Sequence, residues 1–110
     1  MASIERKQKM QLKIVHVKMI ENSECDFSVS SLNKVVLVDR KVDTYNSLKK
    51  LVLDEFFQGQ NINPELFRLR AYNVQFQILL DTYEGREDMT LELLKIYPMK
   101  TLALEERPNA

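Results

Sequence analysis

One segment of this chain has helical periodicity, and the segments on both sides of it alternate like strands. The apolar residues of that segment recur at intervals of three, four and four and so share one helix face: Tyr45, Leu48, Val52 and Phe56. Asp43 and Thr44 precede them and are suitable N-caps, because their side-chain oxygens can accept hydrogen bonds from the first helical turn. Gly59 stands where a helix commonly ends. The sequence therefore predicts a single main helix near the middle of the chain.

Apolar and polar residues alternate in the flanking segments, which is the period of a half-buried strand. Strands are expected at residues 10–20, 27–39, 66–72, 76–80 and 101–104. The short connection between the first two favours an antiparallel hairpin. In the third, Phe67, Leu69 and Ala71 share one face and Arg68 and Arg70 the other. This order predicts an α+β roll, a mixed sheet of four to five strands with the helix packed on one face.

The length and composition fit one compact domain. The chain has 110 residues, of which 45% are hydrophobic and 29% charged, well away from the composition of disordered chains. Residues 1–9 are polar and basic without a period, so we expect a flexible N-terminal extension there. The predicted domain spans residues 10–107, and residues 108–110 form a C-terminal tail.

The scarce residue types argue against several functions. Sixteen basic and sixteen acidic residues leave no net charge to attract nucleic acid or an anionic membrane. Cys25 and His16 are the only cysteine and histidine, too few nitrogen and sulfur ligands for a zinc site. Gly59 and Gly85 stand too far apart to form a phosphate-binding loop. We therefore expect no cofactor, metal, nucleic acid or membrane partner. With one cysteine, nothing indicates an oxidising compartment, and we expect the cytosol or nucleus.

The element order and three stretches of sequence resemble ubiquitin, which has the β-grasp fold. The similar stretches are Met10-Gln11-Leu12, then Ile62-Asn63-Pro64-Glu65 with Arg68-Leu69, and finally Thr90-Leu91, Ile96 and Thr101-Leu102-Ala103-Leu104. Most of these positions belong to the expected core, so the resemblance implies the fold and leaves the function open.

A closer resemblance is to the ubiquitin-like modules of large ubiquitin-specific proteases, especially those of the type of ubiquitin carboxyl-terminal hydrolase forty-seven. It rests on Lys34-Val35-Val36-Leu37-Val38-Asp39-Arg40 with Leu48-Lys49, and on Phe67-Arg68-Leu69-Arg70 with Leu80-Asp81. This resemblance implies a non-catalytic module of a multidomain deubiquitinase, a thiol protease whose catalytic domain lies outside these residues. Such a module would contact a protein partner or its own catalytic domain, and we expect it to be monomeric as a fragment. One alternative is a ubiquitin-like binding module of an unrelated ubiquitin-pathway or scaffold protein.

The chain departs from ubiquitin where ubiquitin meets its receptors. On the alignment with ubiquitin, Arg70 and Glu105 occupy two aliphatic positions of the apolar patch that receptors bind. Charged groups cannot reproduce that contact, because burying an unpaired charge is costly. The sequence also ends without a Gly-Gly pair. We therefore expect that ordinary ubiquitin receptors do not bind this chain and that it is not conjugated to other proteins.

The candidate partner surface consists of charged and aromatic residues of the last three strands: Arg68, Arg70, Tyr72 and Glu105. Lys13 could extend it from a neighbouring strand, so that it would suit an acidic partner. The simpler interpretation is a solvated sheet face that keeps the module soluble. A third hypothesis, a small thiol enzyme, would need Cys25 activated by His16, and nothing in the sequence places them together. The sequence thus predicts no catalytic residues.

Overall fold

The chain is described by a computed structural model that covers residues 9–20, 27–98 and 100–107. Its elements, in chain order, are β1 (Lys9–Met19), β2 (Phe27–Asp39), α1 (Tyr45–Phe56), the short 3-10 helix η2 (Pro64–Leu66), β3 (Phe67–Asn73), β4 (Ile78–Thr82) and β5 (Thr101–Glu106). Strand β1 begins at Lys9, so the strand includes the last residue of the expected extension. Residues 1–8 and 108–110 lie outside the described part of the chain.

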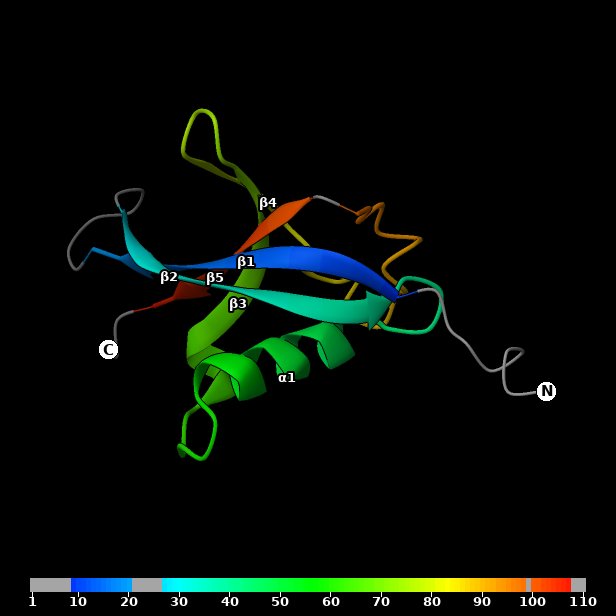
Figure 1. Cartoon of the computed structure of the whole chain (residues 1–110), viewed down its shortest axis with the longest axis horizontal. Coiled ribbons are helices and arrows are strands. Elements are labelled where there is room, and N and C mark those ends of the chain that lie inside the picture. Colours follow the sequence, from blue (N-terminus) through cyan, green and yellow to red (C-terminus); the bar gives the residue numbers. More distant parts are fainter. Residues whose placement is uncertain (1–8, 21–26, 99, 108–110) are drawn as a thin grey trace.

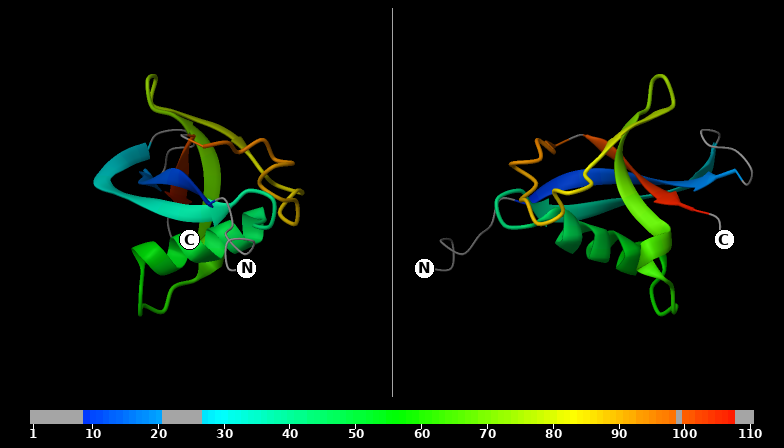
Figure 2. Two further views of the ribbon diagram at one scale, coloured as in Figure 1. Left: turned by 45° about the vertical axis from the view of Figure 1, so that its right-hand side comes forward. Right: turned by 180° about the vertical axis from the view of Figure 1, so that it is seen from behind.

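The five strands form one mixed sheet in the order β2-β1-β5-β3-β4 (Figure 1). Strands β1 and β2 form the expected antiparallel hairpin. Strand β5 enters the middle of the sheet, parallel to β1 and antiparallel to β3. The single α-helix of the described residues lies along one face of this sheet in all the views (Figure 2). The expectation of an α+β roll with the ubiquitin-like β-grasp arrangement is confirmed.

Helix α1 begins at a capping box formed by Thr44 and Ser47. The Thr44 hydroxyl accepts a hydrogen bond from the Ser47 backbone N–H at 3.2 Å, and the Ser47 hydroxyl accepts one from the Thr44 N–H at 2.9 Å. The next two backbone N–H groups donate to carbonyls of the segment after β4, from Tyr45 to Met89 at 3.3 Å and from Asn46 to Glu87 at 3.1 Å. The helix start is therefore joined to the irregular segment that precedes β5.

The main hydrophobic core fills the space between α1 and the sheet. Its fully buried members come from the helix, from four strands and from the segment before β5: Leu12, Ile14, Val38, Leu48, Val52, Leu69, Leu91, Ile96, Leu102 and Leu104. Burying each such side chain contributes about 1.5 to 3 kcal/mol before the loss of conformational entropy is counted. Leu53 is also buried, and Leu51 and Phe57 pack against this core, so core burial explains the wide apolar surface of the helix.

A second, smaller core lies on the sheet face opposite α1, which we call the outer face. It is formed by Val15, Val17, Tyr72 and Ala103, against which Phe27 and Leu79 pack. Strands β2 and β3 are separated in the sheet by two other strands, yet the rings of Phe27 and Tyr72 are 6.3 Å apart. The start of β2 must therefore curl over the outer face, and β2 is strongly curved in Figure 2.

This second core explains why the sequence of β1 shows no clear inward face after Val15. Val15 and Val17 are buried on the outer face, while His16 between them is buried on the helix side. The pairing of β1 with β2 shifts register between Val15 and Val17, which is the kind of irregularity that bends a strand. A strand covered on both faces loses the alternating pattern.

The β3–β4 hairpin differs from the sequence expectation. Strand β4 starts at Ile78, and Phe76 lies in the connecting turn rather than in the strand. Phe76, Ile78 and Leu80 are 64%, 49% and 43% exposed, whereas Leu79 packs against the second core. The hairpin projects away from α1, so its helix-side face has no element to cover it (Figure 1). The apolar residues of β4 therefore alternate as the sequence predicts, but Ile78 and Leu80 are exposed. The face that packs against a core is the other one, which carries Leu79.

Candidate interaction surface

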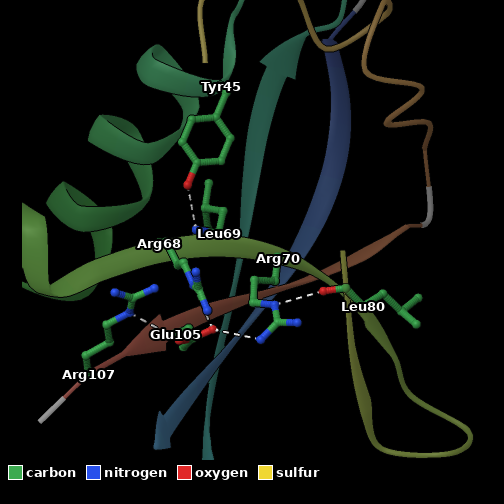
Figure 3. Close-up of polar contacts among 7 residues, drawn as sticks. All are labelled: Tyr45, Arg68, Leu69, Arg70, Leu80, Glu105 and Arg107. Carbon is green, nitrogen blue, oxygen red and sulfur yellow. Dashed lines mark hydrogen bonds and ion pairs between the residues drawn. The ribbon is translucent and has the colours of Figure 1, made fainter. Parts of the chain in front are cut away.

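Arg68 and Arg70 both reach the carboxylate of Glu105 on the neighbouring strand (Figure 3). Arg68 lies directly opposite Glu105 in the antiparallel pairing of β3 with β5. Its Nε donates a hydrogen bond to Glu105 Oε1 at 3.0 Å, and Arg70 Nη1 donates to the same oxygen at 3.2 Å. Arg107 Nε lies 3.6 Å from the other carboxylate oxygen. We call these three arginines around Glu105 the arginine cluster.

Glu105 is buried, with 1% of the residue exposed. An uncompensated carboxylate would be costly at such a site, and the three guanidinium groups supply the compensation. Glu105, a candidate residue of the partner surface, therefore lies beneath the arginines and does not expose its own carboxylate. The side chains of Arg68, Arg70 and Arg107 stay 30%, 19% and 50% exposed. Three cations share one anion, so the excess charge of the cluster is positive and its exposed part belongs to the arginines.

Arg70 has a second contact that links it to the edge of the sheet. Its Nε donates a hydrogen bond to the backbone carbonyl of Leu80 at 2.8 Å (Figure 3). The pairing of β3 with β4 shifts register between Arg70 and Tyr72, so this side chain bonds β4 close to the irregularity. Arg70 therefore holds both β5 and β4, and its role is at least partly structural.

Tyr72 does not contribute its ring to an exposed surface. It is 8% exposed and packs edge-on against Phe27 in the second core. Of the four candidate residues, the structure therefore leaves only Arg68 and Arg70 with partly accessible side chains, and it adds Arg107. Sequence reasoning missed Arg107 because this residue follows the last predicted strand. In the structure its backbone N–H donates a hydrogen bond to the Leu66 carbonyl at 2.8 Å, which continues the pairing of β5 with β3.

Lys13 does not join the arginine cluster. It lies opposite Thr101 in the pairing of β1 with β5, whereas Arg68 lies opposite Glu105, four residues further along β5. The whole of β5 also separates β1 from β3. Arg70, however, lies opposite Ala103, only two residues along β5 from Thr101. No ion pair joins Lys13 to the arginine cluster among the described residues, and the expectation that Lys13 extends its surface stays a prediction.

His16 is a buried histidine with an ordinary set of partners. Its Nε2 lies 2.8 Å from Glu106 Oε1, and its ring meets those of Phe56 and Phe57 edge-on, each at 5.7 Å. Cys25, the thiol of the enzyme hypothesis, lies outside the described residues. The described partners of the His16 imidazole, a carboxylate and two phenyl rings, therefore include no thiol or hydroxyl nucleophile.

Tyr45 has a polar role that its apolar spacing on the helix did not reveal. Its hydroxyl accepts a hydrogen bond from the backbone N–H of Leu69 at 2.9 Å (Figure 3). Strand β4 begins to pair with β3 only at Arg70, so the tyrosine takes the place of a neighbouring strand at this point. Burial raises the pKa of Tyr45, and it also raises the pKa of Tyr83, whose ring is 5.8 Å away.

Among the residues that the structure describes, no three His, Cys, Asp or Glu side chains are grouped so as to hold a metal ion. The described helices include none that has the length and apolar character needed to cross a membrane.

Comparison with known proteins relates the chain to others through its fold. Neither a protein-family model nor a curated protein sequence matches it significantly. Among solved structures, it is similar to the C-terminal ubiquitin-like domain of mouse tubulin-specific chaperone e, with a TM-score of 0.57 and 13% sequence identity. The match covers 94% of this chain and 92% of that domain. The chain is therefore a ubiquitin-like β-grasp domain by fold.

Proposed function

We propose that this chain is a non-catalytic ubiquitin-like module of a multidomain deubiquitinase and works by protein contact in the cytosol or nucleus. The observation that carries the contact role is the outer face, where the partly accessible arginine cluster includes Arg70 and surrounds Glu105. On the alignment with ubiquitin, Arg70 and Glu105 occupy two positions of its apolar patch. The deubiquitinase context is supported by the sequence resemblance, whose two main stretches correspond to β2 with the turn after it and to the start of β3.

The arginine cluster argues for a partner other than an ordinary ubiquitin receptor. A receptor that buries an apolar patch would have to remove Arg68 and Arg107 from water without offering them new hydrogen bonds. A surface with carboxylates would instead form charge-assisted hydrogen bonds with guanidinium groups that stay partly exposed. The module is therefore expected to select acidic protein surfaces, including one on its own catalytic domain.

Two measurements test the proposal. The complete reading frame should encode a catalytic domain with cysteine and histidine boxes, and a frame without them would contradict the deubiquitinase context. The isolated module should not hydrolyse a fluorogenic ubiquitin substrate. Turnover that disappears in Cys25→Ala would overturn the non-catalytic assignment.

The contact role needs the complete protein. In the full-length protease, Arg107→Glu should change kcat/KM for the ubiquitin substrate or the affinity for a bound regulator, because Arg107 is the most exposed arginine of the cluster. Lys50→Glu is the matched control, since it makes the same charge change at an exposed helix position. Equal behaviour of the two variants would remove the arginine cluster from the proposal.

A further inference from the structure

A groove of about 410 Å³ lies at the end of the sheet where β1 begins, apart from the arginine cluster. Its lining residues come from β1, from β2 and from the segment before β5: Lys9, Met10, Gln11, Lys13, Val35 and Pro98. Val35 lies opposite Lys13 and is 55% exposed; Leu37 lies opposite Gln11, also on β2, and is 56% exposed. The groove thus combines an apolar wall with two cationic side chains.

The backbone at this groove is open on one side. Strand β1 starts at Lys9, but its parallel pairing with β5 starts only at Lys13. Between these two residues β1 has a partner strand on its β2 side and no paired strand of the described chain on the other. Unpaired strand edges bind extended peptides through main-chain hydrogen bonds, and neighbouring side chains then provide specificity.

The charges decide which kind of strand could fit. The lining includes two lysines and no acidic residue, and neither lysine takes part in an ion pair among the described residues. Asp39 lies opposite Lys9, but one of its carboxylate oxygens accepts the backbone N–H of Lys41 at 3.0 Å. A second copy of this groove would bring lysines against lysines, which disfavours self-association there. An acidic strand with apolar residues would complement both features.

We propose that this groove binds an extended acidic peptide segment of a protein partner, with the apolar side chains of the segment packed on Val35 and its carboxylates near Lys9 and Lys13. The inference rests on the proposed role as a contact module and names the chemistry of one partner. It adds a second contact site, which shares no lining residue with the arginine cluster.

The test uses the isolated domain and a fluorescein-labelled peptide in which every second residue is alternately aspartate or valine, with serine between them. Both kinds of side chain then lie on one face of the extended peptide, as the pairing of Lys13 with Val35 requires. Binding is followed by fluorescence anisotropy at low and at high salt. Lys13→Glu should weaken binding roughly threefold to tenfold, because one exposed charge contact is lost and a repulsion is added. Lys50→Glu, with the same charge change on the helix, should stay within about twofold.

A second pair of variants tests the apolar wall. Val35→Ser should weaken binding of the same peptide, whereas Val74→Ser should not, although both valines are 55% exposed in the free domain. A peptide with lysine in place of aspartate and a labelled single-stranded oligonucleotide should both fail to bind. The NMR amide shifts induced by the acidic peptide should cluster at residues 9–13 and 35–37.

Three results would overturn the inference. The first is no saturable binding of the acidic peptide, and the second is equal loss in Lys13→Glu and Lys50→Glu, which would mean a general charge effect. The third is a set of NMR shifts centred on Arg68 and Arg107, which would assign the peptide to the arginine cluster. None of these results bears on whether the parent chain is a deubiquitinase, so the two proposals can fail separately.

Discussion

The carboxylate of Glu105, buried on β5, accepts a hydrogen bond from Arg68 Nε at 3.0 Å on the adjacent strand. Because Arg70 and Arg107 approach the same carboxylate, a single anion holds three guanidinium groups at the outer face. Any change of this glutamate therefore alters both the stability of the domain and the surface that it presents.

Glu105→Ala should lower the free energy of unfolding by about 2 kcal/mol. Removing one partner of a buried ion pair typically costs more, about 3 to 5 kcal/mol, but these arginines are partly exposed and can turn toward water. Urea unfolding followed by circular dichroism measures the change. Arg107→Ala is the comparison: it removes the longest and most exposed contact and should cost no more than about 1 kcal/mol. Equal losses in the two variants would contradict this account.

Reversing the charges of Arg68 and Arg70 together should destabilise the domain as well as weaken partner capture. From the sequence alone, Arg68→Glu with Arg70→Glu would be expected to leave thermal stability nearly unchanged. The structure changes that expectation, because new carboxylates would face buried Glu105 and the bond from Arg70 to Leu80 would be lost. Differential scanning calorimetry should show a clear fall in Tm for the double variant, and an unchanged Tm would argue against the observed contacts.

Tyr45→Phe should lower the free energy of unfolding by about 1 to 3 kcal/mol. The substitution leaves the Leu69 backbone N–H without its partner, and an unsatisfied buried donor costs about that much. Tyr97→Phe is a suitable control, since Tyr97 is 48% exposed and its hydroxyl can reach solvent. Chemical unfolding of the two variants should separate them clearly; a similar small effect in both would remove the hydrogen bond as the cause.

The domain should lose stability as the pH rises above about 10, the usual pKa of tyrosine. Burial raises the pKa of Tyr45 and of Tyr83 in the folded state, so the unfolded chain releases these protons first. Stability from this source is complete below the unfolded pKa and falls as the pH rises toward the folded pKa. Urea midpoints measured from pH 8 to pH 11 should show the decline, and Tyr45→Phe should make it shallower. An equal slope in that variant would exclude Tyr45 as a contributor.

Thr44→Ala should cost about 1 kcal/mol of stability, because it removes the side-chain acceptor of the capping box. Thr44→Ser retains the hydroxyl and should recover most of the loss. Thermal unfolding compares the two variants. If serine fails to restore stability, the contribution of Thr44 comes from its packing and not from the cap.

Much of the fold follows from local pattern. The spacing of Tyr45, Leu48 and Val52 predicts α1, and Thr44 is one of the two N-caps that the sequence suggested. The order of the strands around this helix predicts the roll, because each element must bury its apolar face against another. The periodicity of a single element depends on nearest neighbours in the chain, so it can be read without knowing what packs against it.

The amino-acid sequence alone determined the set of elements and the main core. The tertiary structure decided which residues pack together and which charges pair on the outer face. Alternation shows that Arg68, Arg70 and Glu105 point away from the helix, but not that β5 places them around one carboxylate. It also does not show that Phe27 covers Tyr72. These outcomes depend on strand order and on the curl of β2, which arise from contacts between segments far apart in the chain. For that reason Glu105 is buried although its residue type is usually exposed.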